Sequence, residues 1–124
     1  MEQWTTLEQT LGILIEKSDD VECVISMSTT AARQPFGVLH GGANGVLVEH
    51  AGSILANSRA PEGRIAMGTE LSVTQLAANA TPLARAHAQV IHQGRSSICL
   101  SINVTDANGT ITAVGRLTCV FVAA

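Results

Sequence analysis

The chain has 124 residues, of which 46% are hydrophobic and 14% charged, and its formal net charge is −3. This size and composition predict a single compact domain over residues 1–124 and exclude two full domains. Its seven Lys and Arg residues form no basic stripe, and two Phe, one Trp and no Tyr leave no aromatic platform for stacking bases. We therefore expect no nucleic-acid partner.

The cysteines and the first residues bear on the cellular compartment. Cys23, Cys99 and Cys119 are an odd number of thiols, widely spaced in apolar segments, which argues against disulfides and predicts buried, reduced thiols. The start is polar rather than basic and then apolar, and no uncharged apolar run approaches the roughly 20 residues of a membrane span. These features predict a cytoplasmic protein with no membrane partner.

The periodicity changes along the first half of the chain. Leu7, Leu11, Leu14 and Ile15 have the spacing of one short amphipathic helix. Residues 21–27 then alternate apolar and polar side chains, as a half-buried strand does.

The longest helical pattern begins at Ala43. Apolar residues recur there at spacings of three and four, and the pattern ends near Ser58, before Pro61 and Gly63. This segment is predicted to be the main helix.

The second half of the chain has the pattern of four strands, at residues 64–76, 83–92, 96–105 and 110–122. The connections are short and contain turn residues: Thr81-Pro82, Gln93-Gly94 and Asp106-Ala107-Asn108-Gly109. Connections this short require antiparallel neighbours and exclude a parallel nucleotide-binding sheet. The sequence therefore predicts an α+β fold in which one long helix covers an antiparallel sheet.

Residues 34–42 read Gln-Pro-Phe-Gly-Val-Leu-His-Gly-Gly and directly precede the main helix. Gly41 and Gly42 let a ligand approach the backbone closely, and a helix N-terminus offers unpaired N–H groups at the positive end of the dipole. This combination suits a developing oxyanion. The plain alternative is a Gly-Gly pair that only makes a tight turn into the helix.

Glu49 lies in this otherwise apolar helix. Steps of three and four place Gly45, Gly52, Ser53 and Ala56 on its side. A carboxylate at a pocket wall could act as base or nucleophile, whereas the alternative is a partly exposed glutamate on a solvated face. The small residues favour the pocket, because glycine is a poor helix former and serves no purpose on a solvent face.

Residues 34–42 followed by Glu49 resemble the signature of hotdog-fold acyl-CoA thioesterases of the phenylacetate and 4-hydroxybenzoyl-CoA group. Residues 67–71 (Met-Gly-Thr-Glu-Leu) and 92–95 (His-Gln-Gly-Arg) resemble later strand motifs of that group, so the resemblance covers nearly the whole chain. It implies a hotdog fold, in which a long central helix is wrapped by an antiparallel sheet of about five to six strands. It also implies hydrolysis of an aryl or hydroxyaryl thioester of coenzyme A or an acyl carrier protein.

Carried over by position, the resemblance implies a set of catalytic residues. Glu49 would be the base or nucleophile, and the backbone N–H of Gly41 would donate to the carbonyl oxygen. Gln34 and His40 would orient the thioester, and Ser53 matches a hydroxyl position that holds the attacking water.

A second set of residues is expected to contact the substrate or its CoA portion. Arg95 is the preferred phosphate contact, because it follows a glycine in a hairpin; the alternative for it is a solvated surface charge. The set is Gly42, His92, Gly94, Arg95 and Ser96.

Helix geometry predicts how Gly41 and Glu49 cooperate. They are eight residues apart, which is about 12 Å along one helix axis. One thioester carbonyl cannot lie about 3 Å from both. If both act on it, Glu49 comes from a second subunit with an antiparallel helix, so a homodimer is the minimal catalytic unit; the resemblance implies a dimer or a dimer of dimers.

Other chemistries fit the sequence less well. His40 and His50, with His87 or His92, lack the spacing of a zinc site, and Ser53 lacks a Gly-x-Ser-x-Gly context, so we expect no metal and no cofactor. Two alternatives remain for the function. One is a hotdog hydratase or dehydratase, although no Asp/His pair suits that reaction; the other is a non-catalytic acyl-CoA binding or regulatory module.

Overall fold

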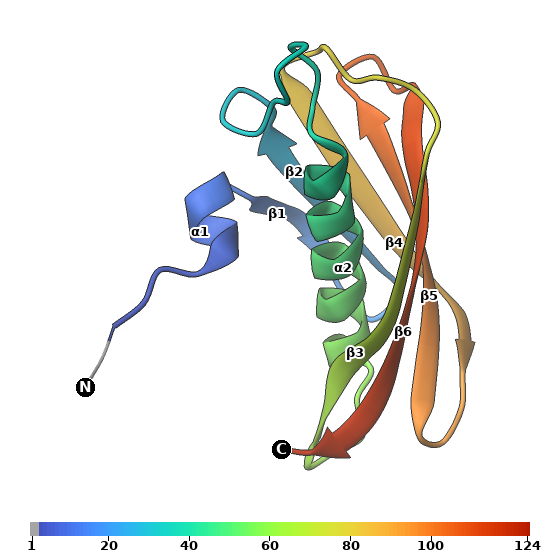
Figure 1. Ribbon diagram of the computed structural model, residues 1–124. Helices are drawn as coiled ribbons and strands as arrows, with labels where there is room; N and C mark the ends of the chain where they lie inside the picture. Colours follow the sequence, from blue (N-terminus) through green and yellow to red (C-terminus); the bar gives the residue numbers. More distant parts are fainter. Residues whose placement is uncertain (1–2) are drawn as a thin grey trace.

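The computed structural model describes residues 3–124, which form two helices and six strands (Figure 1). The helices are α1 (Leu7–Leu11) and α2 (Gly41–Ser58). The strands are β1 (Leu14–Ser18), β2 (Glu22–Ser28), β3 (Arg64–Gln75), β4 (Leu83–Gln93), β5 (Ser97–Asp106) and β6 (Ile111–Ala123).

The strands form one antiparallel sheet in the order β1-β2-β4-β5-β6-β3. Neighbours β4, β5 and β6 are joined by short hairpins, as predicted. The pairing expected across Thr81-Pro82 is wrong, because β3 pairs with β6 and β4 pairs with β2. The two ends of the connection are held by different segments. The Leu76 N–H donates to the carbonyl of Thr112 in β6, and the N–H of Thr29, directly after β2, donates to the Pro82 carbonyl.

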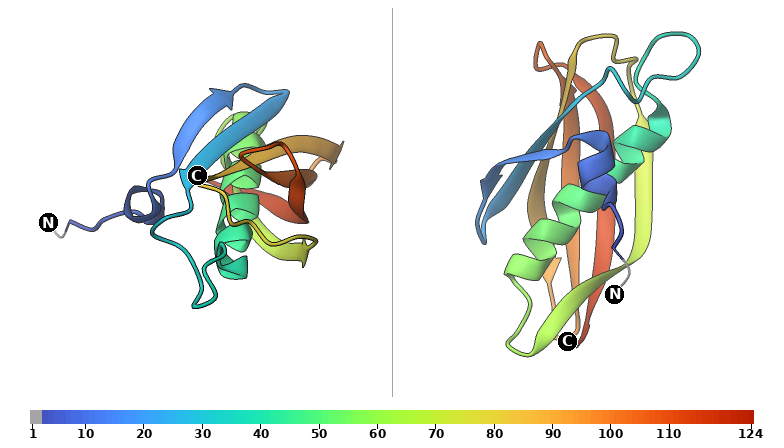
Figure 2. Two further views of the ribbon diagram at one scale, coloured as in Figure 1. Left: turned by 90° about the horizontal axis from the view of Figure 1, so that it is seen from above. Right: turned by 90° about the vertical axis from the view of Figure 1, so that its left-hand side faces the viewer.

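Helix α2 lies along one face of this sheet, which curves around it (Figure 2). The core between them is aliphatic, and burying one leucine contributes about 1.5–3 kcal/mol. Two glycines let helix and sheet approach closely. A Cβ on Gly115 would lie 2.5 Å from the Val48 Cγ1, and one on Gly52 would lie 2.8 Å from the Leu117 Cδ2. The central buried side chains are Leu47, Ala51, Leu55, Leu100, Ile102 and Leu117.

The prediction that Leu14 and Ile15 continue the first helix is wrong. Thr6 starts α1 with a capping box, and Gly12 ends it in the left-handed conformation at φ 69°. Glycine adopts this conformation without steric cost, so the helix stops and the chain turns into β1. No residue of α1 is buried, and the helix stands apart from the sheet in Figure 1.

The thiols agree with the prediction of reduced cysteines. Cys23 and Cys119 are buried and Cys99 is half-buried, all three free. Burial raises the pKa of the Cys23 thiol to about 11. Within residues 3–124, neither helix is long and apolar enough to cross a membrane.

Candidate active site

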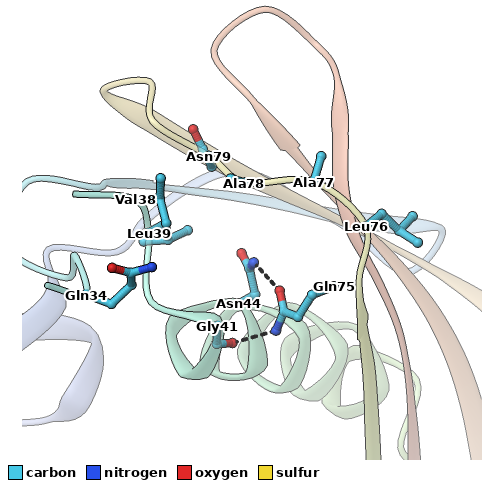
Figure 3. A pocket seen from close by; sticks show the side chains of 10 residues that line it. All are labelled: Gln34, Val38, Leu39, Gly41, Asn44, Gln75, Leu76, Ala77, Ala78 and Asn79. Atoms are coloured by element: carbon cyan, nitrogen blue, oxygen red, sulfur yellow. Dashed lines mark hydrogen bonds between the residues drawn. The ribbon is translucent and has the colours of Figure 1, made fainter. Parts of the chain in front are cut away.

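A pocket of about 320 Å³ lies at the N-terminal end of α2 (Figure 3). The loop before α2 forms one wall, and the end of β3 with the segment after it forms the other. The pocket brings together two of the predicted site residues, Gln34 and Gly41. Its lining residues are Gln34, Val38, Leu39, Gly41, Asn44, Gln75, Leu76, Ala77, Ala78 and Asn79.

The first turn of α2 is capped by His40. Its Nδ1 accepts a hydrogen bond of 2.8 Å from the Gly42 N–H. An imidazole whose Nδ1 accepts carries its proton on Nε2, so the cap fixes the tautomer of the neutral ring. The Gly41 N–H has no acceptor within residues 3–124, as expected of an N–H in a first helical turn. The Gly41 amide is therefore available to a ligand.

Gln34 offers a second donor to the same pocket. Its Oε1 accepts the Phe36 N–H, which leaves Nε2 uncommitted and directed toward the pocket in Figure 3. The loop that carries Gln34 turns at Gly37, which has a φ of 90° and donates its N–H to the Gln34 carbonyl. Only glycine adopts this φ readily, so the turn depends on Gly37. Gln34 and Gly41 thus both line this pocket.

Glu49 lies two turns further along α2 and does not line this pocket. Its side chain is exposed and reaches toward β3, where a Cβ on Gly68 would lie 3.5 Å from Oε2. The pairing of β3 with β6 shifts register between Gly68 and Glu70, so the carboxylate lies beside a bulge at the sheet edge. Burial and the charge of Glu49 raise the pKa of the Cys119 thiol, which argues against a thiolate nucleophile there.

The small residues near Glu49 have another explanation than the predicted one. Gly52 and Ala56 are buried, and Gly52 is small because Leu117 packs against it. They therefore serve the contact between helix and sheet rather than a ligand. Ser53 is half-buried on the turn after Glu49.

The expected CoA-binding residues His92, Gly94, Arg95 and Ser96 lie at the hairpin between β4 and β5. This hairpin is bound to the other end of α2, where the Arg59 Nε donates to the Gln93 Oε1 at 2.7 Å. An 18-residue helix is about 27 Å long. One chain therefore does not bring the hairpin together with Gly41.

The histidines do not cluster. The His87 Nε2 lies 2.8 Å from a Glu22 carboxylate oxygen on the neighbouring strand, away from His40. Across residues 3–124, no group of three His, Cys, Asp or Glu side chains could hold a metal ion.

Sequence reasoning missed several lining residues. Asn44 is a polar residue inside an apolar helix, one turn after Gly41, and this contrast could have identified it. Gln75 and residues 77–79 could not be found, because no local pattern links the end of a strand to a helix 31 residues earlier.

The chain belongs to the thioesterase superfamily, whose sequence model matches residues 36–113. This match, the antiparallel sheet around one long helix and a similar solved structure identify the architecture as the hotdog fold. The predictions of a hotdog fold and of a thioesterase are confirmed. The protein is a thioester hydrolase.

Relatives of the chain include two named thioesterases. The 1,4-dihydroxy-2-naphthoyl-CoA hydrolase of Listeria monocytogenes is 35% identical over 113 residues, covering 90% of this chain and 92% of the relative. The proofreading thioesterase EntH of Cronobacter sakazakii is 34% identical over 113 residues, covering 90% and 82%. The crystal structure of a mutant thioesterase from Pseudomonas aeruginosa has a TM-score of 0.90 at 30% identity, covering 96% of this chain and 87% of that one.

Proposed function

We propose that the protein hydrolyses an aryl or hydroxyaryl acyl-CoA thioester at a site shared by two copies of the chain. In this proposal the Gly41 N–H and Gln34 bind the thioester carbonyl oxygen, and Glu49 of the second copy is the base or nucleophile. The observation that carries it is the exposed Glu49 carboxylate beside the free edge strand β3. A CoA ester with an aryl acyl group is supported by the name of the Listeria relative; an acyl carrier protein is the other carrier.

The distance between Gly41 and Glu49 supports a shared site. The two residues lie about 12 Å apart along the straight helix α2, whereas a carbonyl being attacked lies about 3 Å from its donors. Glu49 also lies outside the pocket that Gly41 lines. A second α2 running antiparallel would bring its Glu49 to this Gly41, and the reverse.

The edge strand β3 supports the way the copies would pair. It is bonded only to β6 within residues 3–124. Leu71 pairs with the buried Leu117 and so faces the α2 side of the sheet, yet its side chain is 41% exposed. Asn57 occupies both backbone groups of Ala66, so pairing between copies would use the residues after it. Antiparallel pairing of two β3 strands would cover this edge and make the helices antiparallel.

This pairing assigns roles to the other expected site residues. The two donors would stabilise the oxyanion, Glu49 would activate water or attack directly, and Ser53 beside it would hold the water. The pairing would also bring the partner's β4–β5 hairpin to the same end of the dimer as Gly41. Gly94, Arg95 and Ser96 of that hairpin, with His92, would then bind the CoA portion, where an arginine suits phosphates.

The reaction is tested by following release of free thiol from aryl, short-chain and long-chain acyl-CoAs and from an acyl-carrier-protein thioester. We expect the highest kcat/KM on an aryl-CoA. Glu49→Gln should keep the fold and lower kcat about 10²-fold or more, as for a positioned base. Near-normal turnover by purified Glu49→Gln protein would refute its assignment.

The shared site is tested by mixing two inactive variants. Gly41→Pro removes the N–H donor at the first helical position, where proline is tolerated, and the extended backbone of His40 suits a residue before proline. After unfolding and refolding a mixture with Glu49→Gln, random pairing should restore about a quarter of the wild-type rate, because half of the dimers have one intact site. No recovery, or a fully active monomer of 12.9 kDa in light scattering, would contradict the shared site.

A further inference from the structure

Two side-chain amides connect the end of β3 with the first turns of α2 (Figure 3). The Gln75 Nε2 donates to the Gly41 carbonyl at 2.9 Å, and the Asn44 Nδ2 donates to the Gln75 Oε1 at 2.8 Å. We refer to these contacts among Asn44, Gln75 and Gly41 as the amide relay. None of the site residues expected from the sequence explains the presence of Asn44 or Gln75.

The relay has only one possible direction. The Gly41 carbonyl can only accept, so Gln75 must turn its Nε2 toward it and its Oε1 toward Asn44. Asn44 must then offer its Nδ2, which leaves its Oδ1 on the other side. That oxygen is buried without a partner within residues 3–124, and the Asn44 residue is 3% exposed.

The unpaired oxygen argues against a role of Asn44 in stability. A buried carbonyl oxygen without a donor destabilises a fold, and asparagine is a poorer helix former than alanine. An alanine at position 44 would avoid both effects. Asn44 is therefore explained by what it does to Gln75 rather than by the strength of the helix.

Gln75 acts on the peptide unit between Gly41 and Gly42. Its Nε2 binds the carbonyl of this unit, and the His40 Nδ1 binds the N–H of the same unit at 2.8 Å. Two successive glycines have no side chains to restrict them, and the first turn of a helix frays readily. These contacts at both ends of the peptide unit thus restrict Gly41, which lines the pocket.

The relay also explains why residue 41 is glycine. A Cβ at this position would lie 2.9 Å from the Gln75 Nε2 and 3.3 Å from its Cδ. A side chain at position 41 would push Gln75 away from the carbonyl. The Gly41 φ is not in the left-handed region, so space and not backbone conformation requires the glycine.

We infer that Asn44 and Gln75 are positioning residues that hold the first turn of α2, so that the Gly41 N–H points at the thioester carbonyl. The inference rests on the proposed function, in which that N–H is the oxyanion donor. Because an oxyanion donor acts mainly in the transition state, a misaligned one lowers kcat more than it raises KM.

The first test compares Gln75→Ala, Gln75→Glu and Asn44→Ala on the CoA ester that the wild type hydrolyses fastest. Each should lower kcat about tenfold with little change in KM. Gln75→Glu keeps the size of the side chain but cannot donate to the Gly41 carbonyl when ionised. Asn44→Ala should show the lower kcat together with an unchanged or higher Tm. The matched control is Gln89→Ala, which removes an exposed glutamine of β4 and should leave kcat unchanged. Wild-type kcat in Gln75→Glu or Asn44→Ala would overturn the inference.

The second test is a double-mutant cycle. Gly41→Ala keeps the N–H but displaces Gln75, so it should lower kcat about as much as Gln75→Ala, about tenfold. The double variant should be no slower than Gln75→Ala alone, because the relay is already broken. If the losses of kcat in the two single variants multiply in the double variant, the Cβ at position 41 acts independently of Gln75, and the inference is overturned.

The third test needs no substrate. Amide hydrogen exchange at Gly42 should be about tenfold faster in Gln75→Ala than in the wild type, and unchanged in Gln89→Ala. Equal exchange in the wild type and Gln75→Ala would overturn the inference whatever the enzyme hydrolyses. A wild type that releases no thiol would instead refute the proposed function, while exchange still decides whether the relay holds the turn.

Discussion

The two ends of α2 differ in how many of their polar groups have hydrogen-bond partners. At the C-terminal end, three successive residues are committed to hydrogen bonds with other elements. The Asn57 Oδ1 accepts the Ala66 N–H at 2.9 Å, the Ser58 hydroxyl donates to the Asp19 carbonyl at 3.2 Å, and the Arg59 guanidinium donates to the Asp20 carbonyl at 2.6 Å. This end ties the helix to β3 and to the turn between β1 and β2.

At the N-terminal end, some polar groups are left without partners. The Gly41 N–H and the Asn44 Oδ1 have none within residues 3–124, and both residues line the pocket. An unpaired buried polar group costs about 1–3 kcal/mol, so its presence at one end and not the other is informative. We call the C-terminal end of α2 (residues 57–59) the closed end and its N-terminal end (residues 40–44) the open end. The closed end ties α2 to the rest of the fold, whereas the open end carries the Gly41 N–H to which the proposed function assigns the thioester carbonyl. Variants at the two ends should therefore separate stability from turnover.

The largest effect is expected at the closed end, from Asn57→Ala. It leaves the Ala66 N–H without its partner and removes the side-chain bonds between the C-terminal end of α2 and β3, so the free energy of unfolding should fall by about 2 kcal/mol. Turnover at saturating substrate should stay near that of the wild type. Denaturant unfolding and a kcat measurement at a temperature where both proteins are folded check this. A large loss of kcat without loss of stability would break the distinction between the two ends.

The sequence predicted α2 and the hairpin strands better than it predicted the place of β3 and the end of α1. Helix α2 and the strands β4 to β6 follow from local periodicity and turn residues, because each pattern reports a face that becomes buried. The place of β3 beside β6 could not be read from the chain, because only the pairing of distant strands decides it. The short first helix ends at Gly12 although the apolar spacing continues to Ile15, because a glycine in the left-handed conformation stops the helix whatever the spacing beyond it.

The candidate site was predictable where one short segment carries it. Gln34, His40 and Gly41 belong to such a segment, and their roles remain predictions. The amide relay was not predictable, because Asn44 and Gln75 meet through the fold and not through spacing. The prediction that Gly52 borders a pocket beside Glu49 was wrong, because glycine also serves close packing of helix and sheet, and Leu117 packs against this one.

A smaller effect is expected at the open end, from His40→Asn. Asparagine is a good N-cap, so its side-chain oxygen should replace the Nδ1 as acceptor and keep the stability within about 0.5 kcal/mol. The imidazole is lost, and kcat should fall about tenfold if it orients the thioester. Denaturant unfolding and steady-state kinetics measure the two effects separately. An unchanged kcat would mean that His40 only caps the helix.

The smallest effect is expected from Arg95→Ala, and it tests whether the closed end contributes to the site of a partner. Arg95 is exposed in the β4–β5 hairpin, and no ion pair holds it within residues 3–124. If it binds CoA phosphates, Arg95→Ala should raise KM about fivefold with a smaller change in kcat, because the contact is the same in the ground and transition states. Added salt should raise the KM of the wild type more than the KM of the variant.

The matched control for Arg95 is Arg116→Ala, which removes the same charge from an exposed position on β6. A KM that rises equally in both variants would point to the net charge of the protein rather than to a phosphate contact. A KM that changes in neither would make Arg95 a solvated surface residue, and the closed end of α2 would then serve stability alone. A rise confined to Arg95→Ala, together with recovery of activity in the mixed dimers, would show that each end of α2 serves a different copy of the site.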